Sequence, residues 1–150
     1  MAIRKILQVG DPILNMQSKI VETFDERLHL LLDDMLETMV KAQGAGLAAP
    51  QVGVLKQAFV VSIDYKTIYE FINPSILENT GSSIDEEGCL SVIGVTGKVE
   101  RPKRILVKAQ DRYGEYFELK ASGFLARAIC HENDHLKGEL FLQKIIKDKV

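Results

Sequence analysis

The residues of this chain that could do chemistry begin with two histidines four positions apart, in the run His131-Glu132-Asn133-Asp134-His135. This run matches the pattern HExxH. Side chains four residues apart lie one above the other on a helix, so both imidazoles can bind one metal ion. Glu132 lies about 100° around the helix from His131, where it could exchange protons with a metal-bound water. Chance gives about 0.005 such matches per chain, so the run predicts a metal site more strongly than two surface histidines.

A catalytic metal site usually has three protein ligands and one open position. Position 141, where one class of HExxH enzymes carries a third histidine, is Phe141, and only fifteen residues follow His135. The only glutamate in that tail, Glu139, is close to the expected helix end. The third ligand is therefore expected upstream of the motif.

Three upstream residues could supply that ligand. His29 has no partner at ligand spacing, which favours a surface or hydrogen-bonded histidine. Cys130 directly precedes the motif and points about 100° away around the helix, so core packing is its expected role. Cys89 sits beside a glycine in the run 86–91, EEGCLS. Taken alone it could equally be buried filler, but beside an HExxH that lacks a ligand, a Cys-His-His site is favoured.

A third polar group ends the run GAGLAAPQ, residues 44–51. The glycines allow close approach of the backbone to its neighbours. No strand is expected before this run and it has no Lys-Ser/Thr ending, so it is neither a dinucleotide fingerprint nor a P-loop. We expect a helix C-cap followed by a close-packed loop, with Gln51 as its polar end.

Two helices are expected to position these groups. The first begins at Asp25 or Glu26 and ends near Gln43, with Asp25 as N-cap and Gly44 as the stop. Its apolar stripe consists of Leu28, Leu31, Leu32, Met35, Leu36, Met39 and Val40. The second helix begins at Gly123, carries HExxH and ends at Gly138, with Ala126, Ile129, Asn133 and Leu136 on one stripe.

Short strands are expected between the helices. Residues 57–63 and 69–72 have strand composition, and the second run is stopped by Asn73-Pro74. Residues 103–110 and 115–121 flank the turn 111–114 and predict a hairpin. Pro102 and the glycines at 88, 94 and 97 suggest irregular connections. Helices at both ends with antiparallel strands between them predict the α+β class.

The composition bounds the function. A chain of 150 residues, 46% hydrophobic and 27% charged, is typical of one globular domain, here 1–150. The net charge of −2 disfavours general DNA or RNA binding. No apolar run approaches ~18–20 residues, which disfavours membrane insertion, and the first residues do not form a signal peptide. We therefore expect a cytoplasmic protein whose two cysteines are not joined in a disulfide.

The three segments GAGLAAPQ, EGCLS and HENDHL together resemble peptide deformylase, whose three motifs they match in order and spacing. The runs IRKILQVGDPIL and FDERLHLLLDDMLETM are also similar to that family, so the resemblance covers nearly the whole chain. It implies an α+β fold with antiparallel sheets around a central helix carrying HExxH. It also implies a hydrolase of protein biosynthesis, which removes the formyl group from the N-terminal formyl-methionine of new polypeptides and releases formate.

The resemblance assigns residue roles by motif match. Cys89, His131 and His135 would bind one divalent metal ion, Fe(II) in the family, with Ni, Co or Zn able to replace it. Ligand chemistry alone allows Zn as readily. The side-chain amide of Gln51 and the backbone N–H of Leu90 would donate to the formyl oxygen.

In the same scheme, Glu132 would take a proton from the attacking water and deliver it to the leaving amine. Substrate selectivity needs an apolar slot for the methionine side chain. Residues one and two helical turns before His131, with the glycine-rich run, could form it: Gly44, Ala45, Leu90, Phe124 and Ala128. Gly46 would form backbone hydrogen bonds with the peptide. Arg127 could reach a substrate carbonyl or extend into solvent.

Two positions depart from the family pattern. Cys130 replaces a frequent Gln and Ile93 replaces a common Pro, which affects loop shape rather than the reacting groups. The expected partners are formyl-methionyl nascent peptides. Some members reach the ribosome through a longer C-terminal helix, so a transient ribosome contact is open for this chain.

Two other functions compete with this one. The first is another HExxH metallohydrolase, such as a small peptidase, which the cysteine ligand and the short tail disfavour. The second is a metal-binding module without catalysis, which the presence of Glu132 and Gln51 disfavours.

Overall fold

The computed structural model describes residues 2–147 of the chain. Two α-helices, seven strands and three short 3-10 helices (η) follow one another in these residues. The bounds, in chain order, are η1 Pro12–Asn15, α1 Glu26–Lys41, β1 Gly46–Ala48, η2 Ala49–Val52, β2 Ala58–Val61, β3 Tyr69–Thr80, β4 Ser83–Cys89, β5 Val92–Arg101, β6 Arg104–Gln110, β7 Tyr116–Ser122, α2 Gly123–Leu136 and η3 Phe141–Lys144.

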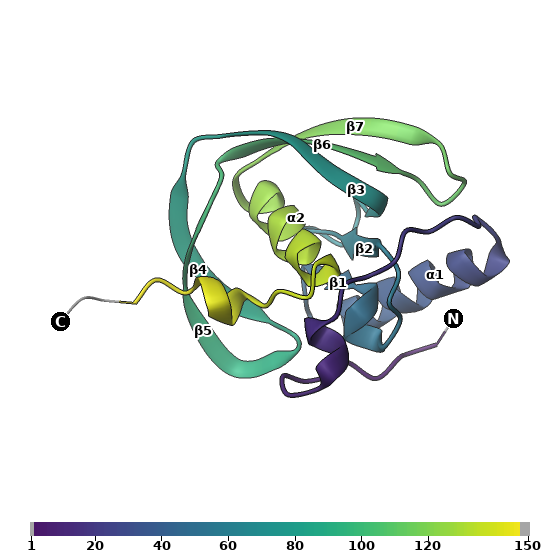
Figure 1. Cartoon of the computed structure of the whole chain (residues 1–150), viewed down its shortest axis with the longest axis horizontal. Helices are drawn as coiled ribbons and strands as arrows, with labels where there is room; N and C mark the ends of the chain where they lie inside the picture. Colours follow the sequence, from purple (N-terminus) through teal and green to yellow (C-terminus); the bar gives the residue numbers. More distant parts are fainter. Residues whose placement is uncertain (1, 148–150) are drawn as a thin grey trace.

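The strands form two antiparallel sheets around α2. One sheet has five strands in the order β1-β2-β3-β6-β7, and β4 and β5 form a separate two-stranded hairpin. Figure 1 shows α2 in the middle of the molecule, with this hairpin on one side of it and β3, β6 and β7 on the other. The predicted α+β class is confirmed, with antiparallel sheets around the helix that carries HExxH.

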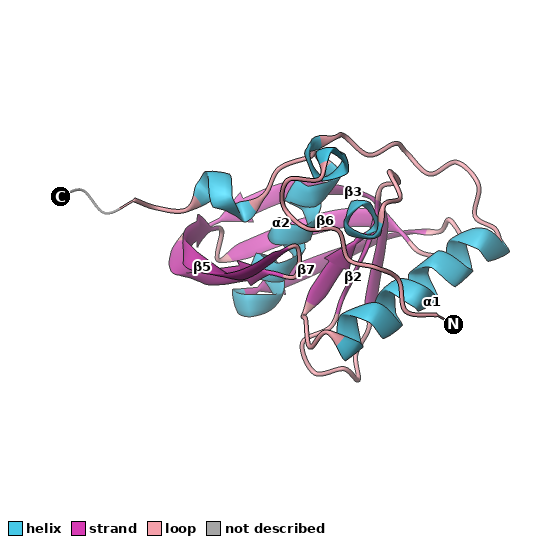
Figure 2. Ribbon diagram, turned by 90° about the horizontal axis from the view of Figure 1, so that it is seen from below, coloured by secondary structure: helices cyan, strands magenta, loops and turns pink. Residues whose placement is uncertain are grey.

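Strand β2 is buried on both faces because each helix covers one of them. Phe59 and Val61 pack in the cluster that contains Ile129 of α2, while Ala58 and Val60 pack in the cluster of α1. This alternation follows from the period of two along a strand. Figure 2 shows α1 on one side of β2 and α2 on the other.

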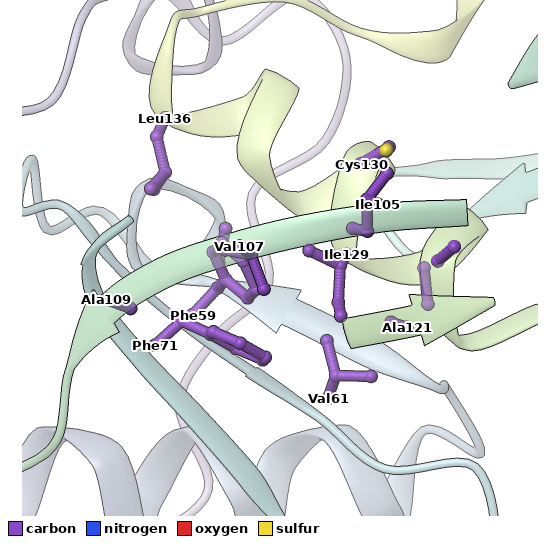
Figure 3. Close-up of a cluster of buried hydrophobic side chains, with 13 residues drawn as sticks. Phe59, Val61, Phe71, Ile105, Val107, Ala109, Ala121, Ile129, Cys130 and Leu136 are labelled. Atoms are coloured by element: carbon purple, nitrogen blue, oxygen red, sulfur yellow. The ribbon is translucent and has the colours of Figure 1, made fainter. Parts of the chain in front are cut away.

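Aromatic side chains fill the cluster between α2 and the five-stranded sheet (Figure 3). The rings of Phe59 and Phe71 lie 4.9 Å apart between centroids, and Phe71 also contacts Phe117. Ile129 and Val107 approach the same cluster from α2 and β6. This packing holds α2 against the sheet and so fixes the position of its polar residues.

Helix α2 is buried almost all round, since every residue from 126 to 136 is buried. Such a helix would be apolar if packing alone decided its composition. It instead carries buried charged or ionisable side chains, which must be paired or functional: Arg127, His131, Glu132, Asp134 and His135.

Helix α1 begins and ends close to the predicted residues. The side chain of Asp25 accepts a hydrogen bond from Leu28 N at 3.1 Å, as an N-cap does. At the other end, Gly44 N donates to Met39 O at 3.0 Å and Gln43 adopts the left-handed conformation, with φ of 60°. The residue that reverses the chain is thus Gln43 rather than the predicted Gly44. Val40, expected in the apolar stripe, is exposed.

Three predictions of local structure were wrong. The run 44–51, expected as a loop after the helix cap, contains β1 and most of η2, because its backbone pairs with β2. Strand β3 continues through Asn73-Pro74, because Asn73 takes a positive φ of 52° and the pairing with β6 shifts between Ile72 and Ser75. The side chain of Asn73 also bonds both backbone groups of Val21. The glycines at 88, 94 and 97 lie in the β4–β5 hairpin and not in connections, although the strand pairing is irregular between Glu87 and Cys89.

The hairpin of β6 and β7 is confirmed, with the Asp111 side chain accepting from Tyr113 N and Glu115 N in its turn. Methionines 35 and 39 lie in the core as expected. Over residues 2–147, no helix is both long and apolar enough to cross a membrane.

We predict that Gly138→Ala destabilises the fold far more than Gly94→Ala. Both glycines have φ of +79°, so each alanine meets a backbone cost of about 1–2 kcal/mol. A Cβ added at Gly94 would meet no atom within 4 Å, whereas one added at Gly138 would lie 2.7 Å from the carbonyl carbon of Asn15. The substitution at Gly138 would therefore force η1 and the end of α2 apart. Chemical denaturation should show an additional loss above about 2 kcal/mol at this position. Equal losses would mean that this contact relaxes without cost.

Candidate metal centre

Cys89, His131 and His135 come together although the thiol lies more than forty residues before the imidazoles. One ligand atom from each lies within 4.8 Å of the others, and Cys89 Sγ is 3.3 Å from His135 Nε2. The imidazoles project from α2, and the thiol stands at the end of β4, where the hairpin turns. The three residues that the sequence proposed as ligands are therefore neighbours.

The geometry of the donor atoms fits a small divalent cation. Bond lengths of about 2.3 Å to sulfur and 2.1 Å to nitrogen at a tetrahedral angle place S and N about 3.6 Å apart. The 3.3 Å between Cys89 and His135 is close to this separation. One thiolate with two imidazoles is a donor set for transition metals such as Zn, Fe, Ni or Co, and not for Ca or Mg.

The carboxylate of Glu87 orients His131. Its Oε1 accepts from His131 Nδ1 at 2.9 Å, which leaves Nε2 of this ring to face the other two donors. A carboxylate in this place fixes the tautomer and raises the basicity of a ligand histidine. Burial opposes protonation of His131, but its contacts with Cys89 and Glu87 outweigh burial and raise the pKa of His131 to about 10.

His135 responds to the same surroundings in the opposite direction. Burial, followed by the charge of His131, lowers the pKa of His135 to about 3. This ring is therefore neutral at physiological pH and offers a lone pair. A neutral imidazole is the form that binds a metal, so His131, whose raised pKa favours the cation, must release its proton when an ion binds.

Buried charges extend from Glu87 across α2. Glu87 Oε2 accepts from Arg101 Nε at 2.8 Å and from Arg127 Nη1 at 2.7 Å. Arg101 Nη1 also donates to Asp134 at 2.6 Å, and Lys144 Nζ lies 2.8 Å from the same carboxylate. These contacts hold the pKa of Glu87 well below its usual range, against burial, through His131 first and then Arg101.

These supporting residues were not predicted from the sequence. Glu87 and Asp134 both lie inside the singled-out motifs, so their acidic side chains were visible. A search for the carboxylate that a ligand histidine needs could have found Glu87. Arg101 gave no local signal, because only the hairpin brings it to α2.

Arg127 was expected either to reach a substrate carbonyl or to extend into solvent, and the structure places it in a third environment. It is 5% exposed, so the solvent-extended alternative is wrong. Nη1 donates to Glu87 and to Val99 O, and Nη2 donates to the backbone and side chain of Ser83. Its terminal nitrogens are thus engaged in holding α2 to the hairpin, although the residue lines the cavity described below.

Glu132 is a buried acid of the site that is available for proton transfer. It is 4% exposed, and among residues 2–147 its Oε1 has no hydrogen-bond partner. Burial, opposed by the charge of His131, raises the pKa of Glu132 to about 7. A carboxyl with this pKa can both accept and release a proton near neutral pH.

Strand β1 passes very close to Glu132. A Cβ added at Gly46 would lie 2.5 Å from Glu132 Oε2, so only glycine allows this approach. The side chain of Gln51, in η2 just after β1, is buried beside the thiol. Its Nε2 donates to Ser91 Oγ at 3.0 Å and lies 3.6 Å from Cys89 Sγ, while Oε1 accepts from Ala48 N. Ser91 was not singled out from the sequence.

Leu90 forms the tip of the β4–β5 hairpin between the thiol and Ser91. Its carbonyl accepts from Gln8 Nε2 at 3.0 Å, which ties the tip to the N-terminal segment. Its side chain lies against Gly44, where an added Cβ would come within 2.6 Å of Cδ1. The predicted residues Gly44 and Leu90 are therefore in contact.

A cavity of about 380 Å³ opens beside these groups, which is within the range of small-molecule sites. Every residue proposed for the site except the deeper His135 lines it: Gly44, Ala45, Gly46, Gln51, Cys89, Leu90, Phe124, Arg127, Ala128, His131 and Glu132. Gln43, Glu86, Glu87 and Gly88 complete the lining. Phe124 is 55% exposed and stands at the rim.

The residues that the sequence disfavoured as metal ligands do not line the cavity. His29 Nε2 is 2.8 Å from Arg112 O, which confirms a hydrogen-bonded histidine. Cys130 packs in the core as expected, and burial raises the pKa of its thiol to about 11. Ile93 is exposed on β5.

Comparison with known proteins agrees with this geometry. A family model described as polypeptide deformylase matches residues 3–150. The peptide deformylase of Caldicellulosiruptor bescii is 58% identical over 147 residues, covering 98% of this chain and 88% of that protein. The peptide deformylase of Alkaliphilus metalliredigens is 51% identical over 148 residues, covering 99% of this chain and all of that protein.

Solved structures give the same result. The crystal structure of peptide deformylase from Thermotoga maritima superposes with a TM-score of 0.94 at 42% identity, covering 97% of this chain and 99% of that chain. The enzyme from Synechococcus elongatus in complex with actinonin superposes with a TM-score of 0.91 at 40% identity, covering 95% and 78% of the two chains.

We predict that Arg101→Met is strongly destabilising and that Arg112→Met is not. Each arginine bridges two carboxylates, but the Arg101 side chain is 4% exposed and that of Arg112 is 23% exposed. Losing Arg101 leaves Glu87 and Asp134 undercompensated in the interior, which should cost about 3–5 kcal/mol. Losing Arg112 should cost about 1 kcal/mol or less. Chemical denaturation measures the free energy of unfolding of both variants. Similar losses would show that the buried carboxylates do not require Arg101 as a compensating charge.

Proposed function

The chain belongs to the peptide deformylase family, and from this premise we propose how its residues perform the reaction. The enzyme removes the formyl group from the N-terminus of nascent polypeptides. The products are formate and a free amino group. The amide carbon of the formyl group must be attacked by water, so the site needs an electrophilic centre, a proton carrier and donors for the developing oxyanion.

We propose that Cys89, His131 and His135 hold the metal ion. The support is the 4.8 Å limit on their donor atoms and the orientation of His131 by Glu87. When bound, such an ion acts as a Lewis acid that polarises the formyl oxygen and makes water more acidic. The donor set suits several metals, and the family resemblance favours Fe(II) among them.

Glu132 is proposed as the proton carrier. Its free Oε1 and its raised pKa allow it to take a proton from the attacking water and to pass it to the leaving amine. Gly46 opposite it leaves room for the scissile group, because any side chain there would meet the carboxylate.

Two donors are proposed for the oxygen that gains charge. Gln51 Nε2 lies beside the thiol and is held by Ser91, so it is oriented before substrate arrives. The backbone N–H of Leu90 follows directly after Cys89. Losing one such donor typically costs about 2.7–4 kcal/mol of transition-state stabilisation.

The edge of β1 is the proposed binding site for the peptide backbone. β1 is the outermost strand of its sheet, and Ser62 N donates to Ala45 O at 2.9 Å. Alternate residues of an antiparallel pair face their partner, so the N–H and C=O of Gly46 face away from β2. An extended peptide can pair with this edge.

The methionine side chain then enters the cavity between this strand and α2. Ala128 and Phe124 form one side of the proposed slot, and Gly44, Ala45 and Leu90 form the other. Arg127 is proposed to line the slot through its side-chain stem, because its terminal nitrogens are already engaged with Glu87 and Ser83.

A single observation favours this function over a peptidase or a metal module without catalysis. The buried Glu132 carboxylate, whose Oε1 has no hydrogen-bond partner in the described part of the chain, and the Cys-His-His cluster border one small cavity with an apolar side. We further propose that the reaction takes place in the cytoplasm. A transient contact with the ribosome stays a prediction.

We predict that Glu132→Ala abolishes deformylation and leaves the metal in place. Without the carboxyl no group carries the proton, so formate release from formyl-Met-Ala-Ser should fall at least about 100-fold. Elemental analysis of protein purified without oxygen should give the metal content of the wild type. The control is Glu139→Ala, which changes an acid outside the cavity and should leave formate release unchanged.

The same assay tests the function itself. Wild-type protein that releases amino acids from unformylated peptides, with no formate from formylated ones, would be a peptidase. Full activity in the Glu132→Ala variant would assign the proton transfer to another group.

We predict that Cys89→Ala lowers metal occupancy and that Cys130→Ala does not. Both substitutions remove a thiol within the same molecule, but only the Cys89 sulfur approaches His135. Metal-to-protein ratios after dialysis against a chelator should fall for the first variant alone. Equal occupancy in both variants would place the third ligand elsewhere.

A further inference from the structure

The wall of the cavity at Gly44 is held from outside by a tyrosine. Tyr65 lies in the connection between β2 and β3, and its Oη donates to Gly44 O at 2.9 Å. Gly44 lines the cavity, whereas Tyr65 stands behind it and is 43% exposed. Tyr65 thus bonds a residue of the cavity wall without lining the cavity itself.

The connection that presents Tyr65 is closely hydrogen-bonded. Ser62 Oγ accepts from Tyr65 N at 2.9 Å and donates to Thr67 O at 2.8 Å. Asp64 Oδ1 accepts from Lys66 N at 2.9 Å and from Thr67 N at 2.8 Å. These bonds give the segment one shape, so the phenol is held in place before any peptide binds.

Backbone strain is concentrated around the same peptide group. Over the residues from 2 to 147, three positions other than glycine have positive φ: Gln43, Tyr65 and Asn73. Two of them meet at Gly44, since Gln43 precedes it and Tyr65, with φ of 59°, donates to its carbonyl. A bulky residue in this conformation is unfavourable and persists only where its surroundings enforce it.

Gly44 has little freedom on its remaining sides. Its N–H donates to Met39 O near the end of α1. Its Cα faces the Leu90 side chain so closely that an added Cβ would lie 2.6 Å from Leu90 Cδ1. Its carbonyl is the group that Tyr65 holds. A change at that carbonyl therefore moves the wall relative to Leu90, which forms the same side of the slot.

We propose that Tyr65 is a positioning residue that sets the width of the slot through the carbonyl of Gly44. This inference rests on the proposed function, because it takes the cavity to be the site of the methionine side chain. Tyr65 touches neither substrate nor metal ligands. It sharpens the preference for methionine over smaller first residues.

The test is Tyr65→Phe, which removes one oxygen and keeps the ring. A hydrogen bond of this kind corresponds to roughly a three- to tenfold effect. KM for formyl-Met-Ala-Ser should rise by about this factor while kcat stays within about twofold, since the wall contacts ground state and transition state alike. The ratio of kcat/KM for formyl-Met-Ala-Ser to that for formyl-Ala-Ala-Ser should fall by a similar factor.

The matched control is Tyr116→Phe. Tyr116 lies on β7, is 69% exposed, and its hydroxyl makes no hydrogen bond within the described part of the chain. This variant should keep the wild-type KM and the wild-type preference. Thermal unfolding of Tyr116→Phe should match the wild type, and Tm of Tyr65→Phe should fall by no more than the few degrees that one hydrogen bond accounts for.

Three results would overturn the proposal. Unchanged KM and preference in Tyr65→Phe would show that the contact does not shape the slot. An equal fall in kcat for both substrates together with a lower Tm would show a purely structural role. Wild-type protein that releases no formate would remove the proposed function and this inference with it, whereas the first two results leave the proposed function intact.

Discussion

The site depends on the buried carboxylate of Glu87, which joins the β4–β5 hairpin to α2. It accepts from His131, Arg101 and Arg127, so all its charge is compensated inside the protein. An unpaired carboxylate in this place would cost several kcal/mol. Because buried ion pairs seldom stabilise a fold more than apolar packing does, the orientation of His131 is the physical gain that this arrangement offers.

Close approach of three segments completes the site. β1 passes Glu132 at Gly46, and the end of α1 meets the tip of the hairpin at Gly44. A Cβ at either glycine would clash with its neighbour. The glycine-rich run therefore lets Glu132 and Cys89 lie beside the same small cavity. Burial within this volume raises the pKa of Glu132 to about 7.

Prediction from sequence succeeded where the signal was local. The spacing of His131 and His135, the N-cap at Asp25 and the turn between β6 and β7 each depend on residues within one or two turns of chain. It failed at Asn73, where a tertiary hydrogen bond to Val21 carries β3 through a positive φ, and at Gly97, which pairs with Glu87 in the β4–β5 hairpin. At Asn73 a distant segment outweighed local preference, and at Gly97 strand pairing did.

The sequence alone determined that two imidazoles share one face of a helix, that Glu132 lies beside them, and that a thiol from a glycine-flanked turn was available. It determined these because helix periodicity is a property of neighbouring residues. The orientation of His131 by Glu87, the compensation of Glu87 by Arg101 and Arg127, and the contact of Tyr65 with Gly44 all depend on tertiary packing. These contacts join residues 14 to 44 positions apart, and their partners are selected by how the hairpin, β1 and α2 pack against one another.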